Sequence, residues 1–451
     1  MRKYFGTDGI RRIANTELTP DLVFRVAKAG AYVLAKQTNH TPTILIGRDT
    51  RISGTLIESA MTSGFLSYGA NVKQLGVLPT PAIAYITRKL NADASVVISA
   101  SHNTFEFNGI KYFSNKGMKI SDELEEQIEE IMDSDSLSAL TAVGEHIGVS
   151  EIENEYAMEY IKFFNEIFKD YFKDKKIKIG IDTANGAKYK VAEEIFKNLG
   201  IDYKIINNSP NGININDNCG STHLENISKF VKENKLDLGI AYDGDGDRCL
   251  AVDENGNTID GDIIMAIISD YFKSNNIMKN NTLVATVMSN LGLKKYAEEN
   301  SIDLKQTKVG DRYVLEEMLK SGYNLGGEQS GHIIMLDYNP TGDGILTSLM
   351  LIKAILEKNK KASEVAKIIN IYPQVLINAK VNSDKKNDYQ NDKEICEEIK
   401  KLEEEFSGNG RVLIRPSGTE PKVRVMIEGE NKEYITKKAQ DLADLIERKL
   451  K

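Results

Sequence analysis

The sequence predicts an α/β protein built from three related mixed-sheet α/β domains around a cleft, followed by a C-terminal α+β domain. Three observations lead to this fold class. Apolar runs of strand length alternate with amphipathic helical stretches over most of the 451 residues, as in α/β units. Three of these runs lead directly into the polar loops SASHN, DGDGDR and GEQSGH, and open α/β sheets bind ligands in such loops. After Tyr372 the order changes to a strand, a helix, two strands and a terminal helix, which is typical of a separate α+β domain.

Local periodicity predicts the individual elements. The clearest strand and helix pairs are TILIG before 55–70, IKIGID before 187–199 and TLVATV before 291–299. Two stretches with helical spacing are expected to be packing helices without chemistry, the charged 121–134 and the aromatic 151–172. In the last part of the chain we expect the strands PQVLINAKV, RVLIR and KVRVMIEG and helices near 391–406 and 431–450.

These elements predict four domains. The expected ranges are 1–155 for the α/β domain with the serine loop, 156–258 for that with the acidic loop, 259–370 for that with the third polar loop, and 371–451 for the α+β domain. The stretch before the last domain, EKNKKASEVAKIINIYP, is helical and then turns at Pro373. We therefore expect a junction and hinge near 360–373.

Composition and charge exclude several classes of protein. The 58 basic and 66 acidic residues give a net charge of −8, so no global attraction to nucleic acid or to an anionic membrane is expected. The start of the chain lacks the apolar region of a signal peptide, and no stretch approaches the ~20 apolar residues of a membrane span. We expect a cytoplasmic protein without a membrane partner. The three cysteines, Cys219, Cys249 and Cys396, lie far apart, which indicates neither a disulfide framework nor a zinc site.

Aspartates alternate with glycines in the run DGDGDR, which ends at Arg248. Glycine leaves the backbone free to curl, so the carboxylates of Asp243, Asp245 and Asp247 can converge on one hard cation such as Mg²⁺. A solvated acidic turn is the simpler alternative. An EF-hand is another, because Glu254 fits its last ligand position, but Arg248 stands where that loop needs glycine and both flanks read as strands. We expect a phosphate-handling Mg²⁺ site, with Arg248 near a bound phosphate or ester.

A candidate nucleophile ends the run VVISAS. Ser101 would be exposed to a cleft at the end of a strand, with His102, Asn103 and Lys111 as polar and cationic neighbours. These residues alone are a weak signal, because adjacent serine and histidine are more often accidental. The GxSxG pattern of hydrolases is absent.

Two further loops offer groups for a ligand. GGEQSGHI, from Gly326 to Ile333, combines a carboxylate, an amide, a hydroxyl and an imidazole, which suit hydrogen bonds to sugar hydroxyls. RPSGTEPKVR, from Arg415 to Arg424, combines two arginines, two hydroxyls and glycine amides, the groups of an anion-binding nest. Either loop could instead be a polar turn. The second lacks the P-loop pattern, so nucleotide binding is not indicated.

These four loops, in this order, resemble the α-D-phosphohexomutase superfamily over essentially the whole chain. The resemblance implies a phosphoryl group on Ser101 and one Mg²⁺ held by Asp243, Asp245, Asp247 and Ser101. The catalytic groups that it implies are Ser101, Arg11, His102, Lys111 and His332. The implied substrate-binding groups are Arg248, Gly310, Asp311, Glu328, Gln329 and Ser330 near the sugar, and Arg415, Ser417, Gly418, Thr419 and Arg424 for the distal phosphate.

Several stretches resemble the phosphoglucosamine mutase branch of this superfamily. They are FGTDGIR at the start, PNGININDNCGSTH at 210–223, VGDRYV around Gly310, and Gln329 within GEQSG. Phosphomannomutases and phosphoglucomutases more often have another residue at the position of Gln329. Thr104 departs from the family, which commonly has proline after SHN, so the rigid turn of a proline is missing here.

The branch implies interconversion of glucosamine 6-phosphate and glucosamine 1-phosphate. Phosphorylated Ser101 would give its phosphoryl group to the free sugar position, with glucosamine 1,6-bisphosphate as intermediate and activator. The partner is then a small sugar phosphate, and Ser101 would be primed by a kinase or by self-phosphorylation. The alternatives are a phosphomannomutase or phosphoglucomutase, a phosphatase with a nucleophilic aspartate, and a non-enzymatic metal-binding phosphoprotein.

Overall fold

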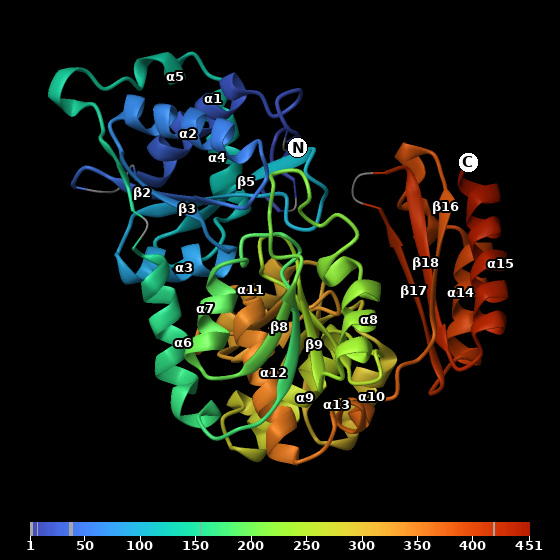
Figure 1. Ribbon diagram of the computed structural model, residues 1–451. Coiled ribbons are helices and arrows are strands. Elements are labelled where there is room, and N and C mark those ends of the chain that lie inside the picture. Colours follow the sequence, from blue (N-terminus) through green and yellow to red (C-terminus); the bar gives the residue numbers. More distant parts are fainter. Residues whose placement is uncertain (1–2, 7, 36–38, 154, 418–419) are drawn as a thin grey trace. The chain divides into compact units, whose positions relative to one another are not determined.

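The computed structural model describes residues 3–451 other than 7, 36–38, 154 and 418–419. By their internal contacts the residues form two compact units, one made of 1–287 with 303–367 and the other of 288–302 with 368–451. In the part of the chain described, the first unit contains three mixed sheets and the second unit one antiparallel sheet (Figure 1). None of the described helices is both long enough and apolar enough to cross a membrane.

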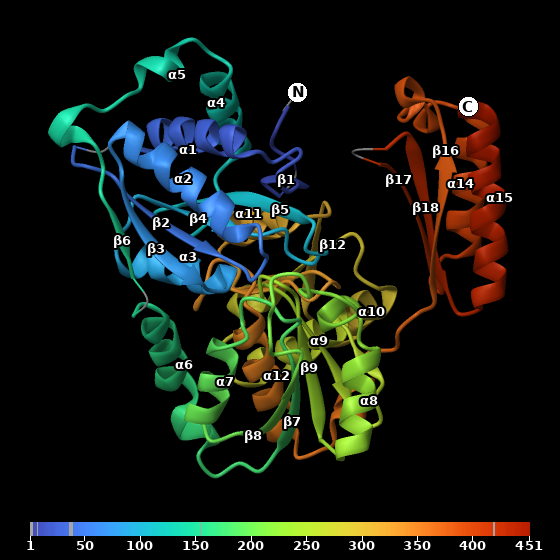
Figure 2. The ribbon, with the colours of Figure 1, turned by 45° about the horizontal axis from the view of Figure 1, so that its top comes forward.

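The first sheet has six strands in the order β1-β5-β4-β2-β3-β6. Their bounds are Ile10–Ile13 (β1), Thr43–Arg48 (β2), Asn71–Val77 (β3), Ala94–Ile98 (β4), Phe107–Ser114 (β5) and Ser150–Ile152 (β6). Strands β2, β3, β4 and β6 are parallel, and β5 is antiparallel to both β4 and β1. Helices α1 (Pro20–Ala35), α2 (Gly54–Tyr68) and α4 (Asp122–Met132) cover one face, and α3 (Thr80–Lys89) lies on the other (Figure 2). Two short turns, α5 (Ser136–Ala139) and η1 (Gly144–His146), precede β6.

Local sequence explains several of these boundaries. Helix α4 begins after Ser121, whose Oγ accepts a hydrogen bond from the Leu124 N–H, and α2 ends at Gly69, which has a left-handed φ of 105°. The helix predicted over 151–172 is wrong in its first part. There Ser150–Ile152 pairs with β3 as an edge strand, and α6 spans only Ala157–Phe172.

The second and third sheets share the mixed pattern. The second has the order β11-β10-β9-β7-β8, with bounds Lys178–Asp182 (β7), Asp202–Ile206 (β8), Leu238–Tyr242 (β9), Cys249–Asp253 (β10) and Thr258–Ile259 (β11). The third has the order β13-β12-β14-β15, with bounds Thr282–Thr286 (β12), Asp303–Thr307 (β13), Leu325–Gly327 (β14) and Ile333–Met335 (β15). The helices of these two segments are α6, α7 (Val191–Asn198), α8 (Glu225–Asn234), α9 (Gly261–Ser274), α11 (Asp311–Ser321), α12 (Gly344–Lys358) and α13 (Ala362–Val365). Their short turns are η2 (Gly220–Thr222), η3 (Lys279–Asn281) and η4 (Ala366–Ile368).

One topological feature recurs in all three sheets. A strand of the parallel set ends in a polar loop, and the chain returns as an antiparallel neighbour: β4 to β5, β9 to β10, and β14 to β15. The strands β4, β9 and β14 are buried throughout, so their loops start from fixed points. These loops are SASHN, DGDGDR and GEQSGH, so the predicted fold of related mixed-sheet units is confirmed for this part of the chain.

The second unit is an antiparallel sheet with helices. Its strands lie in the order β16-β18-β17, with bounds Gln374–Lys380 (β16), Gly410–Pro416 (β17) and Lys422–Gly429 (β18). Its helices are α10 (Leu291–Glu299), α14 (Lys393–Glu405) and α15 (Lys432–Leu450), with short turns η5 (Ser383–Lys385) and η6 (Asp388–Gln390). Buried residues of β18, α14 and α15, such as Val425, Ile395 and Leu442, form one core, as the α+β prediction required.

Helix α10 also belongs to this unit, because residues 288–302 group with residues 368–451. These 15 residues interrupt the part of the chain that forms the first unit. Glu428 on β18 is fully buried and accepts hydrogen bonds from Asn290 Nδ2 (3.3 Å), from the Leu291 N–H (3.2 Å) and from Arg411 Nε (2.9 Å). The polar cluster thus ties the start of α10 to the sheet. The predicted four-domain ranges stay a prediction.

Candidate active site

Three loops of the first unit meet at Ser101. This serine follows β4, is 1% exposed, and its Oγ donates a hydrogen bond of 2.7 Å to Oδ2 of Asp243 after β9. Its φ of 51° is left-handed, a conformation that costs about 1 kcal/mol or more in a residue other than glycine. The loop after β14 contacts the acidic loop through an isolated β-bridge between His332 and Arg248. The nucleophile, the acids and the third loop predicted from the sequence are therefore neighbours.

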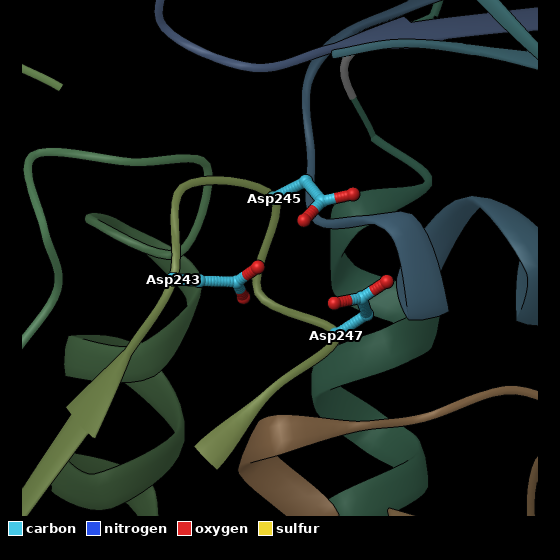
Figure 3. A group of neighbouring side chains, drawn as sticks. All are labelled: Asp243, Asp245 and Asp247. Atoms are coloured by element: carbon cyan, nitrogen blue, oxygen red, sulfur yellow. The ribbon is translucent and has the colours of Figure 1, made fainter. Parts of the chain in front are cut away.

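The three aspartates form a buried group that could hold a cation. Asp243, Asp245 and Asp247 are each at most 4% exposed, and one carboxylate oxygen from each lies within 4.8 Å of the others. Figure 3 shows the three carboxylates turned toward one another around the curled loop. Oδ1 of Asp245 and Oδ1 of Asp247 are buried without a hydrogen-bond partner in the described chain, so free oxygen ligands face inward. A divalent oxygen-seeking cation such as Mg²⁺ fits this donor set.

The electrostatics of the acidic loop agree with that fit. Burial, together with the carboxylates of Asp247 and Asp245, raises the pKa of Asp243 to about 8. Burial acts the same way on Asp247, but His332, Lys111 and Arg248 hold the pKa of its carboxyl below the ordinary value. A bound cation would relieve the electrostatic repulsion among these three carboxylates.

Lys111 and Arg11 form the cationic side of the site. Lys111 is 2% exposed, and its Nζ lies 3.0 Å from Oδ2 of Asp245 and 3.1 Å from Oδ2 of Asp8. Burial lowers the pKa of Lys111, but those two carboxylates raise it overall, so the ammonium keeps its charge. Arg11 donates to Asp8 (2.9 Å) and to Oδ1 of Asn103 (3.2 Å), two residues after Ser101. Both cations therefore lie beside the acidic loop and the Ser101 loop, where they could stabilise negative charge on a ligand.

His102 is held as a neutral imidazole. Arg248 donates from Nη1 to Nδ1 of His102 at 3.3 Å, which requires a lone pair on that nitrogen. Burial, Arg248 and Arg11 lower the pKa of His102 to about 4. The nearby Ser101 Oγ lies 3.5 Å from the same nitrogen. His102 is therefore uncharged at neutral pH and a weak base.

His332 has both ring nitrogens engaged within the protein. The Gly342 N–H donates to Nε2 at 3.0 Å, and Nδ1 lies 3.5 Å from Oδ2 of Asp247. Burial lowers the pKa of His332, but the carboxylates of Asp247 and Asp311 raise it overall. Because Nε2 accepts from the backbone, the geometry assigns a proton to Nδ1, facing Asp247. The imidazole thus orients one of the acids.

The residues expected around the sugar lie next to this histidine. Glu328 accepts a hydrogen bond from the Gly310 N–H (3.1 Å), and burial raises the pKa of its carboxyl. Gln329 donates to Oδ2 of Asp260 at 3.2 Å. The Ser330 hydroxyl is buried without a partner among the described residues, so it is available to a ligand. Gly310 has a φ of 130°, which an L side chain rarely adopts.

The anion-binding loop predicted in the last domain lies in the second unit. Arg415 on β17 faces Arg424 on β18 as a direct cross-strand pair, and no described carboxylate forms an ion pair with either. Burial and the charge of Arg424 lower the pKa of Arg415, whose Nε is buried without a described partner. Ser417 is 3% exposed and accepts from the Glu420 N–H. Gly418 and Thr419 lie outside the described residues. Two facing arginines that lack a described carboxylate partner could bind an anion.

Sequence reasoning missed Asp8 and Lys119. Lys119 bonds to Asp8 and, at 2.6 Å, to Oδ2 of Asp311, and Asp8 in turn contacts Lys111 and Arg11. Burial raises the pKa of Asp8, but these cations lower it well below its usual range. No local pattern could have found this network, since Lys119 lies 111 positions from Asp8 and 192 positions from Asp311. The stretch FGTDGIR did hold Asp8, but only Arg11 stood out in it.

Family models match nearly all of the chain. They are phosphoglucomutase/phosphomannomutase α/β/α domain I over residues 2–139, domain II over 158–256, domain III over 260–372 and the C-terminal domain over 376–445.

Individual relatives give the same result. A curated phosphoglucosamine mutase of Ruminiclostridium cellulolyticum is 54% identical over 450 residues, 100% of both chains. The crystal structure of a phosphoglucomutase/phosphomannomutase family protein from Burkholderia thailandensis has a TM-score of 0.80 at 21% identity, covering 98% of this chain and 97% of that one. An Aspergillus fumigatus N-acetylphosphoglucosamine mutase, solved with GlcNAc-6P and magnesium, has a TM-score of 0.66 at 18% identity, covering 99% and 96%. The chain therefore belongs to the phosphoglucomutase/phosphomannomutase family, the α-D-phosphohexomutases, and stands close to its phosphoglucosamine mutases.

Proposed function

We propose that the chain is a phosphoglucosamine mutase that interconverts glucosamine 6-phosphate and glucosamine 1-phosphate through phosphorylated Ser101. The observation that carries the phosphoryl-transfer part is the 2.7 Å contact between Ser101 Oγ and Asp243 inside a buried acid triad. A hydroxyl in that position can carry a phosphoryl group whose oxygens meet the cation. The 54% identity to curated phosphoglucosamine mutases supports glucosamine phosphate as the sugar.

The proposal includes Mg²⁺ held by Asp243, Asp245 and Asp247, with an oxygen of the group on Ser101 completing the set. The fungal N-acetylphosphoglucosamine mutase solved with magnesium supports this choice of metal. When bound, the cation spreads the negative charge of the transferred phosphoryl oxygens. Thr80 Oγ1 and Lys111 Nζ both donate to Oδ2 of Asp245 and keep that carboxylate oriented.

The chain's own groups then account for the transfer. In one direction a sugar hydroxyl oxygen bonds to phosphorus as the P–O bond to Ser101 Oγ breaks, and the proton of the sugar hydroxyl ends on Ser101 Oγ, which leaves free Ser101 and glucosamine 1,6-bisphosphate. After the bisphosphate reorients in the site, its other phosphoryl group is transferred to Ser101 Oγ. Lys111 and Arg11 stabilise charge as donors, and the raised pKa of Lys111 keeps its ammonium charged. His332 holds Asp247 through Nδ1, and His102 and Arg248 line the approach to Ser101.

The remaining assignments concern the ends of the substrate. Glu328, Gln329, Ser330, Gly310 and Asp311 are proposed to bind the sugar through their amide, hydroxyl and carboxylate groups. The non-reacting phosphate is proposed to bind at Arg415, Ser417, Gly418, Thr419 and Arg424, a role supported by the two facing arginines of the second unit. The proposal also includes the cytoplasmic setting expected from the sequence and priming of Ser101 by a kinase or by self-phosphorylation.

A kinetic comparison tests the proposal. Purified protein with Mg²⁺ and catalytic bisphosphate should convert glucosamine 1-phosphate with a kcat/KM above that for glucose 1-phosphate and mannose 1-phosphate. Ser101→Ala should abolish turnover and leave the protein folded, with a loss of stability of about 1–3 kcal/mol because the buried Asp243 carboxylate loses one donor. Ser63→Ala on the surface of α2, whose Oγ donates to the Ser59 carbonyl, is the matched control and should keep full activity. Residual turnover by the Ser101→Ala variant would point to an aspartate nucleophile, and a preference for mannose or glucose phosphate would replace the sugar assignment.

A further inference from the structure

Arg51 is a fully buried arginine next to the candidate nucleophile loop. It follows β2 in the stretch GRDTR, and its side chain is 0% exposed. Its Nε donates to Oδ2 of Asp49 at 2.8 Å. A buried guanidinium needs partners for all five of its N–H groups, so the remaining four show what this residue is for.

All four go to the backbone of the loop that carries Ser101. Nη2 donates to the carbonyl oxygens of Ser101 (3.0 Å) and Asn103 (2.8 Å), and Nη1 donates to those of Phe107 (3.0 Å) and Thr104. One side chain thus fixes four carbonyls within seven residues. The contact at Thr104 holds the turn that a proline would otherwise stiffen.

Asp49 links the same guanidinium to the amide of the nucleophile. Oδ2 of Asp49 also accepts from Ser99 Oγ at 2.5 Å, and Ser99 Oγ accepts from the Ser101 N–H at 2.9 Å. Ser99 therefore has its hydroxyl committed on both sides and is buried, which excludes it as a substitute nucleophile in this conformation. The C=O of Ser101 is thus held directly by Arg51, and its N–H is held by Ser99, whose hydroxyl is fixed by Asp49.

Asn216 holds the same loop from the second sheet's segment. Its Nδ2 donates to the carbonyls of Ser101 (2.9 Å) and Asn103 (2.9 Å), the two that Arg51 Nη2 also contacts. The side chain of Asn216 is 4% exposed. A Cβ on Gly244 in the acidic loop would lie 2.7 Å from Asn216 Nδ2 and 2.6 Å from the Ser101 carbonyl oxygen, so glycine at that position leaves room for the contact.

We propose that Arg51 and Asn216 are positioning residues that act together as a carbonyl clamp on the loop 101–107, holding Ser101 Oγ in line for phosphoryl transfer. The clamp rests on the proposed role of Ser101. Its physical basis is that the left-handed Ser101 needs support from its surroundings, and a displacement of about 1 Å at a reacting atom can cost about 100-fold in rate.

The test uses the full-length Arg51→Lys and Asn216→Ala proteins. Lysine keeps the charge but cannot fork to four carbonyls. Arg25→Lys and Asn324→Ala are the matched controls, since Arg25 Nη2 bonds to Met132 O and the buried Asn324 Nδ2 bonds to Ile277 O, away from Ser101. We expect kcat to fall about 100-fold in Arg51→Lys and about 10-fold in Asn216→Ala, with KM changed less than about 3-fold. The controls should keep the wild-type kcat.

Two readouts separate positioning from mere stability. The rate at which glucose 1,6-bisphosphate phosphorylates Ser101, followed by intact mass, should fall in parallel with kcat. Hydrogen exchange of the amides in 99–107 should speed up in both variants, and this measurement does not depend on mutase activity. The double variant should lose less than the product of the two single losses, because both side chains act on the same two carbonyls.

The outcomes are distinct. Variants with wild-type kcat, phosphorylation rate and exchange at 99–107, whatever their melting temperature, would overturn the clamp. If Arg51→Lys fails to fold, Asn216→Ala decides by the same three measurements. If the wild-type protein shows no mutase activity but both variants show faster exchange at 99–107, the proposed function would be overturned. The clamp would then still be supported as a structural feature of the loop.

Discussion

At the residue scale, burial and two neighbouring carboxylates strongly raise the pKa of the Asp243 carboxyl. It is ordinary in sequence but lies buried between two other acids and against Ser101 Oγ. The folded protein disfavours its charge, and only a cation or a proton removes that penalty. Metal affinity and metal-free stability should therefore respond in opposite directions when this charge is deleted.

Asp243→Asn should weaken Mg²⁺ binding by at least about tenfold while stabilising the metal-free protein. The folded pKa of about 8 lies above that of an unfolded aspartate, so the folded state binds the extra proton and wild-type stability falls as pH rises from about 4 to about 8. The advantage of the variant should grow over the same window. Titration calorimetry with Mg²⁺ and urea unfolding in chelator at several pH values measure both effects. Asp174→Asn, at an exposed position, is the control, and unchanged Mg²⁺ affinity would remove Asp243 from the metal site.

At the scale of elements, helices α6 and α12 are joined beneath the acidic loop. Asp343 caps α12 by accepting from the Ile345 and Leu346 N–H groups, and both of its oxygens also receive the Tyr160 hydroxyl of α6, at 2.9 and 2.8 Å. The turn before it supplies the Gly342 N–H that orients His332. One buried carboxylate thus connects the packing of two helices to the position of a site residue.

Tyr160→Phe should lower the free energy of unfolding by about 1–3 kcal/mol, because the buried Asp343 carboxylate loses a donor shared by both of its oxygens. Tyr171→Phe on the same helix is the control. Its hydroxyl makes one 3.2 Å bond to Lys353 O at a half-buried position, and we expect a loss below about 1 kcal/mol. Urea unfolding of the two variants measures the difference. Equal losses would mean that the Tyr160 hydroxyl does not stabilise the α6–α12 junction.

Much of the fold could be predicted from sequence at this scale. Strands such as Thr43–Arg48 and Thr282–Thr286 carry continuous apolar runs, and the loops after β4, β9 and β14 have compositions that suit a ligand site, although each loop alone could also be a polar turn. Strand β6 was missed because its three residues are exposed and have no strand signal of their own. The contacts of Asp8, Arg51 and Asn216 were missed for a similar reason, since each depends on a partner far along the chain.

At the scale of the whole molecule, the two units divide the proposed chemistry. The first unit contains Ser101, the acid triad and the sugar loop, and the second contains Arg415 with Arg424. A mutase must bind a phosphate that does not react during each transfer, and binding energy at that phosphate orients the reacting end.

Arg415→Ala should therefore reduce kcat/KM by about 1.5–3 kcal/mol, with kcat as well as KM affected. Ser101 should still be phosphorylated by bisphosphate, only less efficiently, and more free bisphosphate should accumulate during turnover. Steady-state kinetics with mass spectrometry of the bisphosphate measures this. Arg448→Ala, at a position 70% exposed on α15, is the control. Wild-type kinetics and no added release of bisphosphate in the Arg415 variant would mean that the non-reacting phosphate binds elsewhere.

The path of the chain through α10 has a consequence for inheritance. The second unit is discontinuous in sequence, since residues 288–302 lie within the third α/β segment and residues 368–451 follow it. A fragment 368–451 would lack the helix that packs on Glu428, and Gly292 lies so close to the Asn370 carbonyl that a Cβ would stand 2.0 Å from it. A chimera that exchanges only the C-terminal segment between two relatives would pair one parent's α10 with the other's sheet. We therefore expect this unit to fold correctly after exchange between two mutases only when both stretches, 288–302 and 368–451, are exchanged together.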